Sequence, residues 1–113
     1  MIVYKQGDVV LVKFMFSEGT TGYKKRPALV ISSDDYHRNR QEVIIAAITS
    51  NIHRILTGDT KIDEWQKANL LAPSLAAGIV QTVKGEMIER RLGTLSKGDF
   101  HRVQKNLRVL FRL

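Results

Sequence analysis

The sequence predicts a mainly β fold of the α+β class: an antiparallel barrel of about five to seven strands, with a short internal helix and a C-terminal amphipathic helix. Three observations support this prediction. Most apolar residues lie in short runs rich in β-branched side chains, and glycine, proline and polar clusters separate those runs. The C-terminal residues alone show the apolar spacing of a long amphipathic helix. The length of 113 residues suits one domain, so residues 1–113 are expected to fold as a single unit.

Three strands are predicted in the N-terminal half. Each is a run of β-branched and other apolar residues that would be buried on much of both faces. Because proline lacks an N–H, Pro27 is expected at the start of the second strand. The third strand ends on the hydroxyl pair Thr49 and Ser50. The three runs are Val9–Phe16, Pro27–Ser32 and Val43–Ile48, and polar loops are expected between them over Ser17–Lys25 and Ser33–Glu42.

The segment after the third strand is expected to hold a short strand and then the internal helix. Thr60–Ile62 follows a glycine turn and is predicted as the fourth strand. Asp63 is a suitable N-cap for a helix over Glu64–Asn69, because its side chain can accept a hydrogen bond from a backbone N–H of the first turn. Pro73 and Ser74 then break the chain.

The remaining residues predict a hairpin followed by the C-terminal helix. Ile79–Val83 has the composition of a strand, and Met87–Leu92 is expected to be its hairpin partner across a short turn. Ser96 and Asp99 have the spacing of a capping box, so a helix should begin there. Its apolar stripe comprises Phe100, Val103, Leu107 and Leu110, and its basic face comprises Arg102, Lys105, Arg108 and Arg112. We expect the stripe to pack on the core or on a second copy of the chain.

The chain is strongly basic. Eighteen Lys and Arg residues against eleven Asp and Glu residues give a formal net charge of +7. Such a charge attracts polyanions, so nucleic acid is the first partner to consider. A solvated basic surface that serves only solubility is the alternative explanation, and composition alone does not separate the two.

Several protein classes do not fit the sequence. The absence of cysteine excludes disulfides and thiolate metal sites and suits a reducing interior. No signal peptide or membrane-spanning stretch is recognisable, so a cytoplasmic location is expected. Gly-rich phosphate loops, GxSxG elbows and zinc-binding spacings do not occur. The scattered histidines His37, His53 and His101 are expected to face solvent, so we expect chemistry without a metal or another cofactor.

Two polar clusters lie at the ends of predicted strands. Lys24, Lys25 and Arg26 precede the second strand, and Thr49 and Ser50 end the third. A guanidinium and a hydroxyl are groups that bind and orient a phosphate. Taken alone, however, the clusters are better explained as an ordinary solvated charge run and an ordinary strand end.

Four segments, in this order, resemble motifs of the PemK/MazF toxin family. The first is the opening GDVVLV at residues 7–12, and the second, KRPALVIS at residues 25–32, looks like the family signature. The segment AAITS at residues 46–50 is similar to the third-strand motif, and ERRLGTLS at residues 89–96 to the stretch before the last helix. Because these segments span nearly the whole chain at the expected separations, the sequence is identified as a member of this family.

The resemblance implies an SH3-like barrel that forms a homodimer and acts as the toxin of a type II toxin-antitoxin system. It implies a metal-independent, sequence-specific endoribonuclease that cleaves single-stranded RNA, mRNA included, and so inhibits translation and growth. In the implied reaction the ribose 2′-OH attacks the adjacent phosphate and leaves a 2′,3′-cyclic phosphate, so DNA is not a substrate. The implied protein partners are a second copy of the chain and a cognate antitoxin, and DNA would be contacted only through that antitoxin.

By this resemblance, Arg26 and Thr49 are the catalytic residues. Arg26 would stabilise the negative charge of the pentacovalent phosphate, and Thr49 would donate a hydrogen bond to a non-bridging oxygen. The lysines beside Arg26 would anchor neighbouring phosphates. The further RNA-binding residues are expected to be Lys24, Lys25, Ser50 and Gln81.

The general base is the open assignment. Some relatives carry a glutamate five residues before the signature arginine, where this chain has Thr21, so Glu18 in the same loop is the first candidate. Other relatives carry an arginine and an aspartate at places that correspond to Ala76 and Gly78. His37, or positioning of the substrate without a base, is the alternative.

Two other functions stay open at this point. A CcdB-like toxin would poison gyrase without enzymatic activity, through contacts made largely by the C-terminal helix with its arginines. A plain RNA-binding barrel would bind RNA without cleaving it. The pair Arg26 and Thr49 favours the endoribonuclease, because the CcdB-like relatives lack such a pair.

Overall fold

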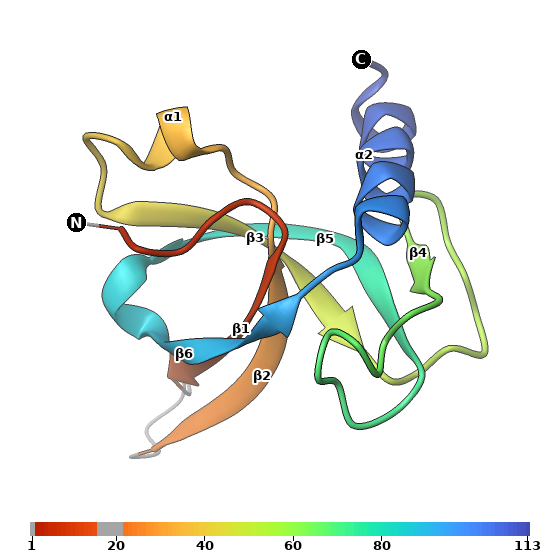
Figure 1. Cartoon of the computed structure of the whole chain (residues 1–113), viewed down its shortest axis with the longest axis horizontal. Coiled ribbons are helices and arrows are strands. Elements are labelled where there is room, and N and C mark those ends of the chain that lie inside the picture. Colours follow the sequence, from red (N-terminus) through yellow and green to blue (C-terminus); the bar gives the residue numbers. More distant parts are fainter. Residues whose placement is uncertain (1, 16–21) are drawn as a thin grey trace.

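The computed structural model describes residues 2–15 and 22–113. Its described strands form one curled antiparallel sheet of six strands in the order β4-β5-β3-β2-β1-β6 (Figure 1). The strands are β1 (Asp8–Met15), β2 (Tyr23–Val30), β3 (Glu42–Thr49), β4 (Thr60–Ile62), β5 (Ser74–Lys84) and β6 (Ile88–Thr94). The helical elements are α1 (Asp34–His37), the single 3-10 turn η1 (Gly85–Met87) and α2 (Lys97–Phe111). The predicted fold class is therefore confirmed.

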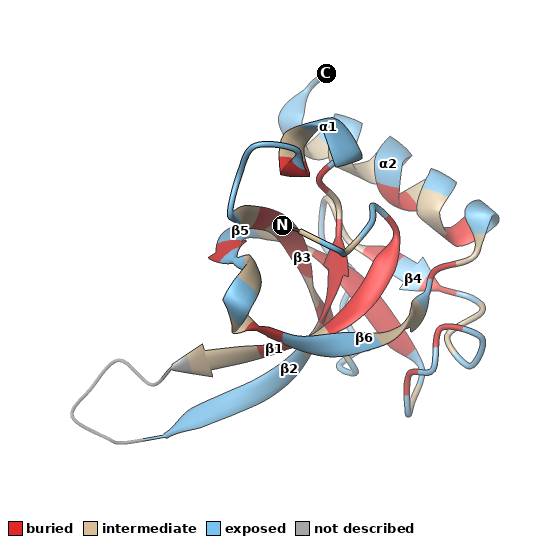
Figure 2. Ribbon diagram, turned by 60° about the vertical axis from the view of Figure 1, so that its left-hand side comes forward, coloured by how far each residue is buried: buried red, intermediate tan, exposed pale blue. Residues whose placement is uncertain are grey.

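The central strands are buried on both faces, as their apolar runs predicted (Figure 2). Successive residues of a strand point to opposite faces, so Val9 belongs to one core and Val10 to the other. The same alternation separates Leu29 from Ala28 in β2. The first core lies between the sheet and α2 and includes Val103, whereas the second is enclosed by the curl of the sheet.

Helix α2 begins where the sequence predicted and covers the first core. The side chain of Ser96 accepts a hydrogen bond from the backbone N–H of Asp99 at 3.1 Å. Val103 is buried, and the rest of the predicted apolar stripe is half-buried. Asn106 donates to the hydroxyl oxygen of Thr60 at 2.7 Å, which fixes the helix against β4. None of the helices in residues 2–15 and 22–113 is long and apolar enough to cross a membrane.

The predicted C-terminal hairpin is wrong in its pairing. β6 pairs with β1 and lies at the opposite edge of the sheet from β4 and β5. The turn η1 replaces a tight hairpin turn, and the N–H of Gly85 donates to the carbonyl of Gln41 at 2.7 Å. The chain is thus redirected at the end of β5, so β6 pairs with the open edge of β1. β5 itself begins at Ser74 and not at Ile79, so Pro73 directly precedes a strand.

Strand β2 starts earlier than predicted. Tyr23 to Lys25 belong to the strand and not to the preceding loop, and Pro27 lies inside the strand, opposite Leu11 of β1. In the described residues, β2 pairs with β3 only over residues 28–30. Pro27 therefore lies where β2 has a single neighbouring strand, and the missing N–H of a proline is tolerated at such an edge.

The internal helix predicted over Glu64–Asn69 is also wrong, because these residues form a series of turns. The N–H groups of Asp63 and Glu64 donate to the carboxylate of Asp99, at 3.2 and 2.9 Å, so the segment is held by a distant helix and Asp63 caps nothing. Asn69 then adopts φ 61°, in the left-handed region, which a continuing helix does not allow.

The short helix is α1, within the stretch predicted as the polar loop Ser33–Glu42. Ser33 acts as its N-cap by accepting a hydrogen bond from a backbone N–H of the helix at 3.1 Å. His37, expected to face solvent, is buried, and its Nε2 lies 2.5 Å from the hydroxyl oxygen of Ser32. The other two histidines, His53 and His101, are exposed as expected.

Candidate functional site

A groove of about 720 Å³ lies where β1, β2 and β6 meet the end of β3 and the segment between β4 and β5. This volume is typical of a ligand site. The groove is lined by Leu11, Lys25, Arg26, Pro27, Ile48, Thr49, Ser50, Asn69, Leu70, Leu71, Ala72, Ser74, Arg90 and Leu92. It therefore combines apolar walls with three cationic side chains and several hydroxyl or amide groups.

The pairing of β2 with β3 explains why Arg26 and Thr49 meet in this groove. The two strands are antiparallel, and Ala28 lies opposite Ala47. If this register is continued by two residues, Arg26 comes opposite Thr49. Residues directly opposite each other in an antiparallel pair point to the same face. The pairing of β2 with β3 ends at Ala28, so the two side chains lie where the strands separate and the groove opens.

The polar groups of Arg26 and Thr49 are available to a ligand. Arg26 is exposed, and its guanidinium forms no ion pair with any residue that the structure describes. The hydroxyl oxygen of Thr49 accepts a hydrogen bond from the N–H of Asn51 at 3.1 Å. This bond uses the acceptor side of the hydroxyl, so its O–H can donate into the groove. Ser50, which follows Thr49, is exposed and also lines the groove.

Lys25 is held by a carboxylate that sequence reasoning did not single out. Its Nζ lies 2.7 Å from Oε1 of Glu89, and the Nζ of Lys13 lies 3.4 Å from the same oxygen. The hydrogen bond that Lys25 donates to Glu89 raises the pKa of Lys25 above its ordinary value, and the same bond lowers the pKa of Glu89. Lys25 is therefore an oriented cation at the edge of the groove and not an unconstrained one.

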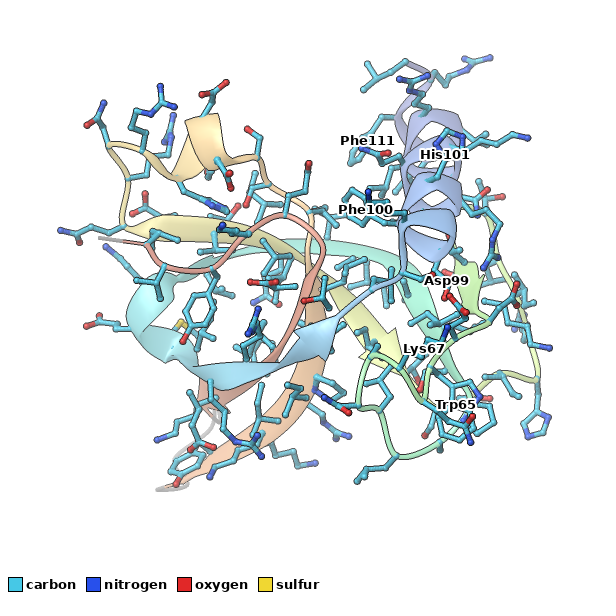
Figure 3. All side chains as sticks on the ribbon, in the orientation of Figure 1. Trp65, Lys67, Asp99, Phe100, His101 and Phe111 are labelled. Atoms are coloured by element: carbon cyan, nitrogen blue, oxygen red, sulfur yellow. The ribbon has the colours of Figure 1, made fainter. Side chains whose placement is uncertain are left out.

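The far wall of the groove is the segment between β4 and β5, which is fixed by three contacts. The side-chain amide of Asn69 donates to the carbonyl of Leu92 at 2.7 Å. Gly93 approaches this segment so closely that an added Cβ would lie 2.6 Å from the carbonyl oxygen of Ala68. Asp99, at the base of α2, accepts the two N–H bonds described above from the start of the segment (Figure 3).

Sequence reasoning named Lys25, Arg26, Thr49 and Ser50 among the lining residues, and three of those that it missed bear on ligand binding. Arg90 adds a third cation from β6, and its only signal was the pair of arginines in the segment at residues 89–96. Asn69 and Leu71 come from the turns that were predicted as a helix. Leu71 is 99% exposed, which places an apolar side chain at the rim of the groove with no covering from the described residues.

The other predicted site residues do not line the groove. Lys24 is exposed on β2, next to Lys25. Gln81 lies on β5 opposite Ile45, four residues along β3 from Thr49, a separation of about 13 Å. His37 lines a different cavity, near the N-terminal segment. Glu18 lies outside the residues that the structure describes.

No group of three or more His, Cys, Asp or Glu side chains gathers closely enough to hold a metal ion within residues 2–15 and 22–113. The ionisable side chains that line the groove are Lys25, Arg26 and Arg90, all cationic. The arrangement can therefore bind a phosphate by charge and orient it by hydrogen bonds.

The curled sheet, its covering helix and the cationic groove define a small basic barrel protein with a site suited to phosphates. The family model of the PemK-like, MazF-like toxins of type II toxin-antitoxin systems matches residues 5–111. The chain belongs to this family, as its sequence motifs predicted. Among curated proteins, none matches the chain at a significant level.

Solved structures of similar proteins share the fold. A MazE-MazF complex from Deinococcus radiodurans gives a TM-score of 0.81 at 17% identity, covering 98% of this chain and 97% of the other. An endoribonuclease in complex with its cognate antitoxin, from Mycobacterial species, gives 0.77 at 16% identity, with the same coverages. The Mycobacterium tuberculosis toxin MazF-mt6 gives 0.75 at 20% identity, covering 94% of this chain and 97% of the other.

Proposed function

We propose that the chain is the toxin of a type II toxin-antitoxin system and that it cleaves single-stranded RNA, mRNA included, in the groove. The observation that carries this proposal is the convergence of Arg26 and Thr49 at the mouth of one cationic groove. Two structurally similar proteins are described as endoribonucleases. The net charge of +7 fits a polyanionic substrate.

The proposed reaction uses the 2′-OH of the substrate as the nucleophile. A new bond forms between O2′ and phosphorus, the bond from phosphorus to O5′ breaks, and the products carry a 2′,3′-cyclic phosphate and a 5′-OH. Arg26 stabilises the negative charge of the pentacovalent phosphate, and Thr49 donates its hydroxyl proton in a hydrogen bond to a non-bridging oxygen. Lys25, Ser50 and Arg90 bind the flanking backbone.

The proton of the 2′-OH needs an acceptor, and the leaving O5′ takes its proton from solvent water. Glu18 remains the proposed acceptor. His37 is not suited to this role in the single chain, because it is buried beside Ser32 and lines another cavity. The reaction requires no metal ion in this proposal, since the charge on the phosphate is offset by guanidinium and ammonium groups.

A homodimer is part of the proposal, and an exposed apolar surface supports it. We call this the end surface; its side chains are 53 to 64% exposed and comprise Ile55, Leu56, Ile79, Val109 and Phe111. Gly58 packs between Gly78 and Leu110, so the loop, β5 and the end of α2 lie together there. Exposed apolar side chains around such a junction are a feature of many protein interfaces. A cognate antitoxin is the second proposed protein partner, as in the similar complexes.

The chemistry is tested with a labelled single-stranded RNA in EDTA. The proposal predicts cleavage without added metal, a 2′,3′-cyclic phosphate on the upstream product and no cleavage of a substrate with one 2′-deoxyribose at the mapped position. Cleavage of that deoxy substrate, or a 5′-phosphate on the downstream product, would contradict 2′-OH attack. RNA binding without any scission would support a plain RNA-binding barrel instead.

A further inference from the structure

Tyr23 is an exposed aromatic residue close to the groove. It is the first residue of β2 and is 47% exposed. Among the described Phe, Tyr and Trp side chains, only Phe111 is comparably exposed, and it belongs to the end surface. The start of β2 projects from the body of the protein, so the ring is presented to solvent on an ordered strand (Figure 2).

Tyr23 lies on the same face of the sheet as part of the groove lining. Side chains alternate along a strand, so Tyr23, Lys25 and Pro27 point to one face of β2. Lys13 and Leu11 are the partners of Lys25 and Pro27 on β1 and share this face. Lys25, Pro27 and Leu11 all line the groove. Tyr23 therefore extends this face outward by one step along the strand, about 7 Å from Lys25. Arg26 starts from the opposite face of β2 and reaches the groove where β2 and β3 separate.

Two lysines contact the ring of Tyr23 from one side. The Nζ atoms of Lys13 and Lys25 lie 5.0 and 5.8 Å from the ring centroid. They also share one oxygen of Glu89, at 3.4 and 2.7 Å. Because both Nζ atoms lie so close to one oxygen, they are too near each other to sit over opposite faces of the ring. Both ammonium groups are thus on the same side, and we assign the exposed area of Tyr23 mainly to the other face.

We propose that Tyr23 is a base-stacking platform for an unpaired RNA base next to the scissile phosphate, with Lys13 and Lys25 beside it to bind the phosphate of that nucleotide. This inference rests on the proposed function, because it takes the groove as the place of the scissile phosphate. Aromatic rings that carry unstacked bases are a general device of single-strand recognition. Glu89 acts as a positioning residue that fixes both lysines relative to the ring.

The test measures binding with an RNA that cannot be cut. The probe is a labelled 2′-O-methyl oligonucleotide of roughly 6 nucleotides, short enough to limit sliding, and affinity is read by fluorescence anisotropy. Tyr23→Ala should weaken binding roughly 5- to 150-fold, the loss expected when one base–aromatic stack is removed. Tyr23→Phe should bind like the wild type, because it keeps the ring. Tyr23→Leu should behave like Tyr23→Ala.

A series of probes with one abasic position each separates stacking from a structural role. When the missing base is the one that stacks on Tyr23, wild type and Tyr23→Ala should bind the probe with equal affinity. When another base is missing, Tyr23→Ala should still bind more weakly than the wild type. The platform would be overturned if Tyr23→Ala lost the same affinity for every abasic probe, or if Tyr23→Leu bound RNA as tightly as the wild type. It would also be overturned if Tyr23→Ala bound the antitoxin more weakly but bound RNA as the wild type does. Because the probe is uncleavable, a protein that never cuts RNA can still pass this test, so the two proposals fail independently.

Discussion

At the scale of single residues, Thr49 is the best-defined group of the site. Its hydroxyl oxygen already accepts a bond from the N–H of Asn51, which orients the O–H as a donor. In the proposed site, Arg26 attracts the phosphate by charge, and Thr49 orients it by a hydrogen bond. The sequence showed both residues but not their proximity, because the proximity depends on a β2–β3 register that no local pattern encodes.

Replacing Thr49 by valine removes the hydroxyl while keeping the shape of the side chain. We expect Thr49→Val to lower the single-turnover cleavage rate on the order of 100-fold, as the loss of one donor to a developing oxyanion does. Thr49→Ser should keep most of the rate. Thr82→Val, on the exposed part of β5, is the matched control and should cut like the wild type. A rate for Thr49→Val within a few-fold of that control would remove Thr49 from the site.

Glu89 limits the charge that Lys13 and Lys25 present to RNA. Its pKa is lowered by Lys25, so the carboxylate stays ionised as the pH falls through the ordinary range of a glutamate, and the ion pair is lost only at still lower pH. Glu89→Gln removes this charge but keeps an oxygen that can accept hydrogen bonds from both lysines, so it should raise RNA affinity at neutral pH without releasing them. The salt slope of log affinity should become steeper by about 0.7, the value for one more phosphate contact on a single strand.

The measurement for Glu89 is a salt titration of RNA binding. Glu86→Gln, an exposed glutamate of η1, removes the same charge away from the lysines and serves as the control. Equal salt slopes for the two variants would show that Glu89 has no special relation to the RNA path.

At the scale of elements, composition identified every strand but not the partner of each. The run that became β6 was predicted to pair with β5, and it pairs with β1 because η1 redirects the chain. Strand propensity reflects how well a residue fits a pleated, half-buried surface, and it does not specify which strand will be the neighbour. The helix predicted over Glu64–Asn69 failed for a related reason: its start is bound by Asp99, which is distant in sequence.

The close approach of Gly93 to the groove wall can be tested by adding a methyl group there. A Cβ at Gly93 would lie 2.6 Å from the carbonyl oxygen of Ala68, which is backbone and cannot move without shifting the wall. Gly93→Ala should lower the free energy of unfolding by about 1–3 kcal/mol and should weaken RNA binding. Urea unfolding gives the first quantity.

Gly98→Ala is the matched control for this variant. Gly98 lies in the first turn of α2, and an added Cβ there has no heavy atom within 4 Å. Alanine favours the helix over glycine, so this variant should be as stable as the wild type or more stable by up to about 1 kcal/mol. If Gly93→Ala unfolds at the same urea concentration as Gly98→Ala, the wall does not depend on this close approach.

At the scale of the whole molecule, the end surface is the feature that a single chain leaves unexplained. Its five apolar side chains stay exposed, although the domain already has two buried cores. The sequence predicted that the apolar stripe of α2 packs on the core or on a second copy. The stripe itself is buried or half-buried against the core, whereas Val109 and Phe111, which are not part of the stripe, are exposed.

Changing Phe111 to glutamate places a charge among the apolar side chains proposed for the dimer contact. We expect wild type to elute as a dimer in size-exclusion chromatography with light scattering, and Phe111→Glu to elute as a monomer, because burying an unpaired carboxylate is costly. Val3→Glu is the control, since Val3 is 70% exposed and lies outside the end surface. A dimer that survives Phe111→Glu would place the interface elsewhere.

The central claim is that RNA is cut in the groove at Arg26, and primer extension on one mRNA in EDTA tests it most directly. Wild type and Arg108→Ala, which loses the same charge from an exposed position on α2, should give the same set of discrete cut sites. Arg26→Ala should lose those cuts by about 100-fold or more in rate. An mRNA left intact by the wild type, or cut equally by Arg26→Ala, would contradict the claim.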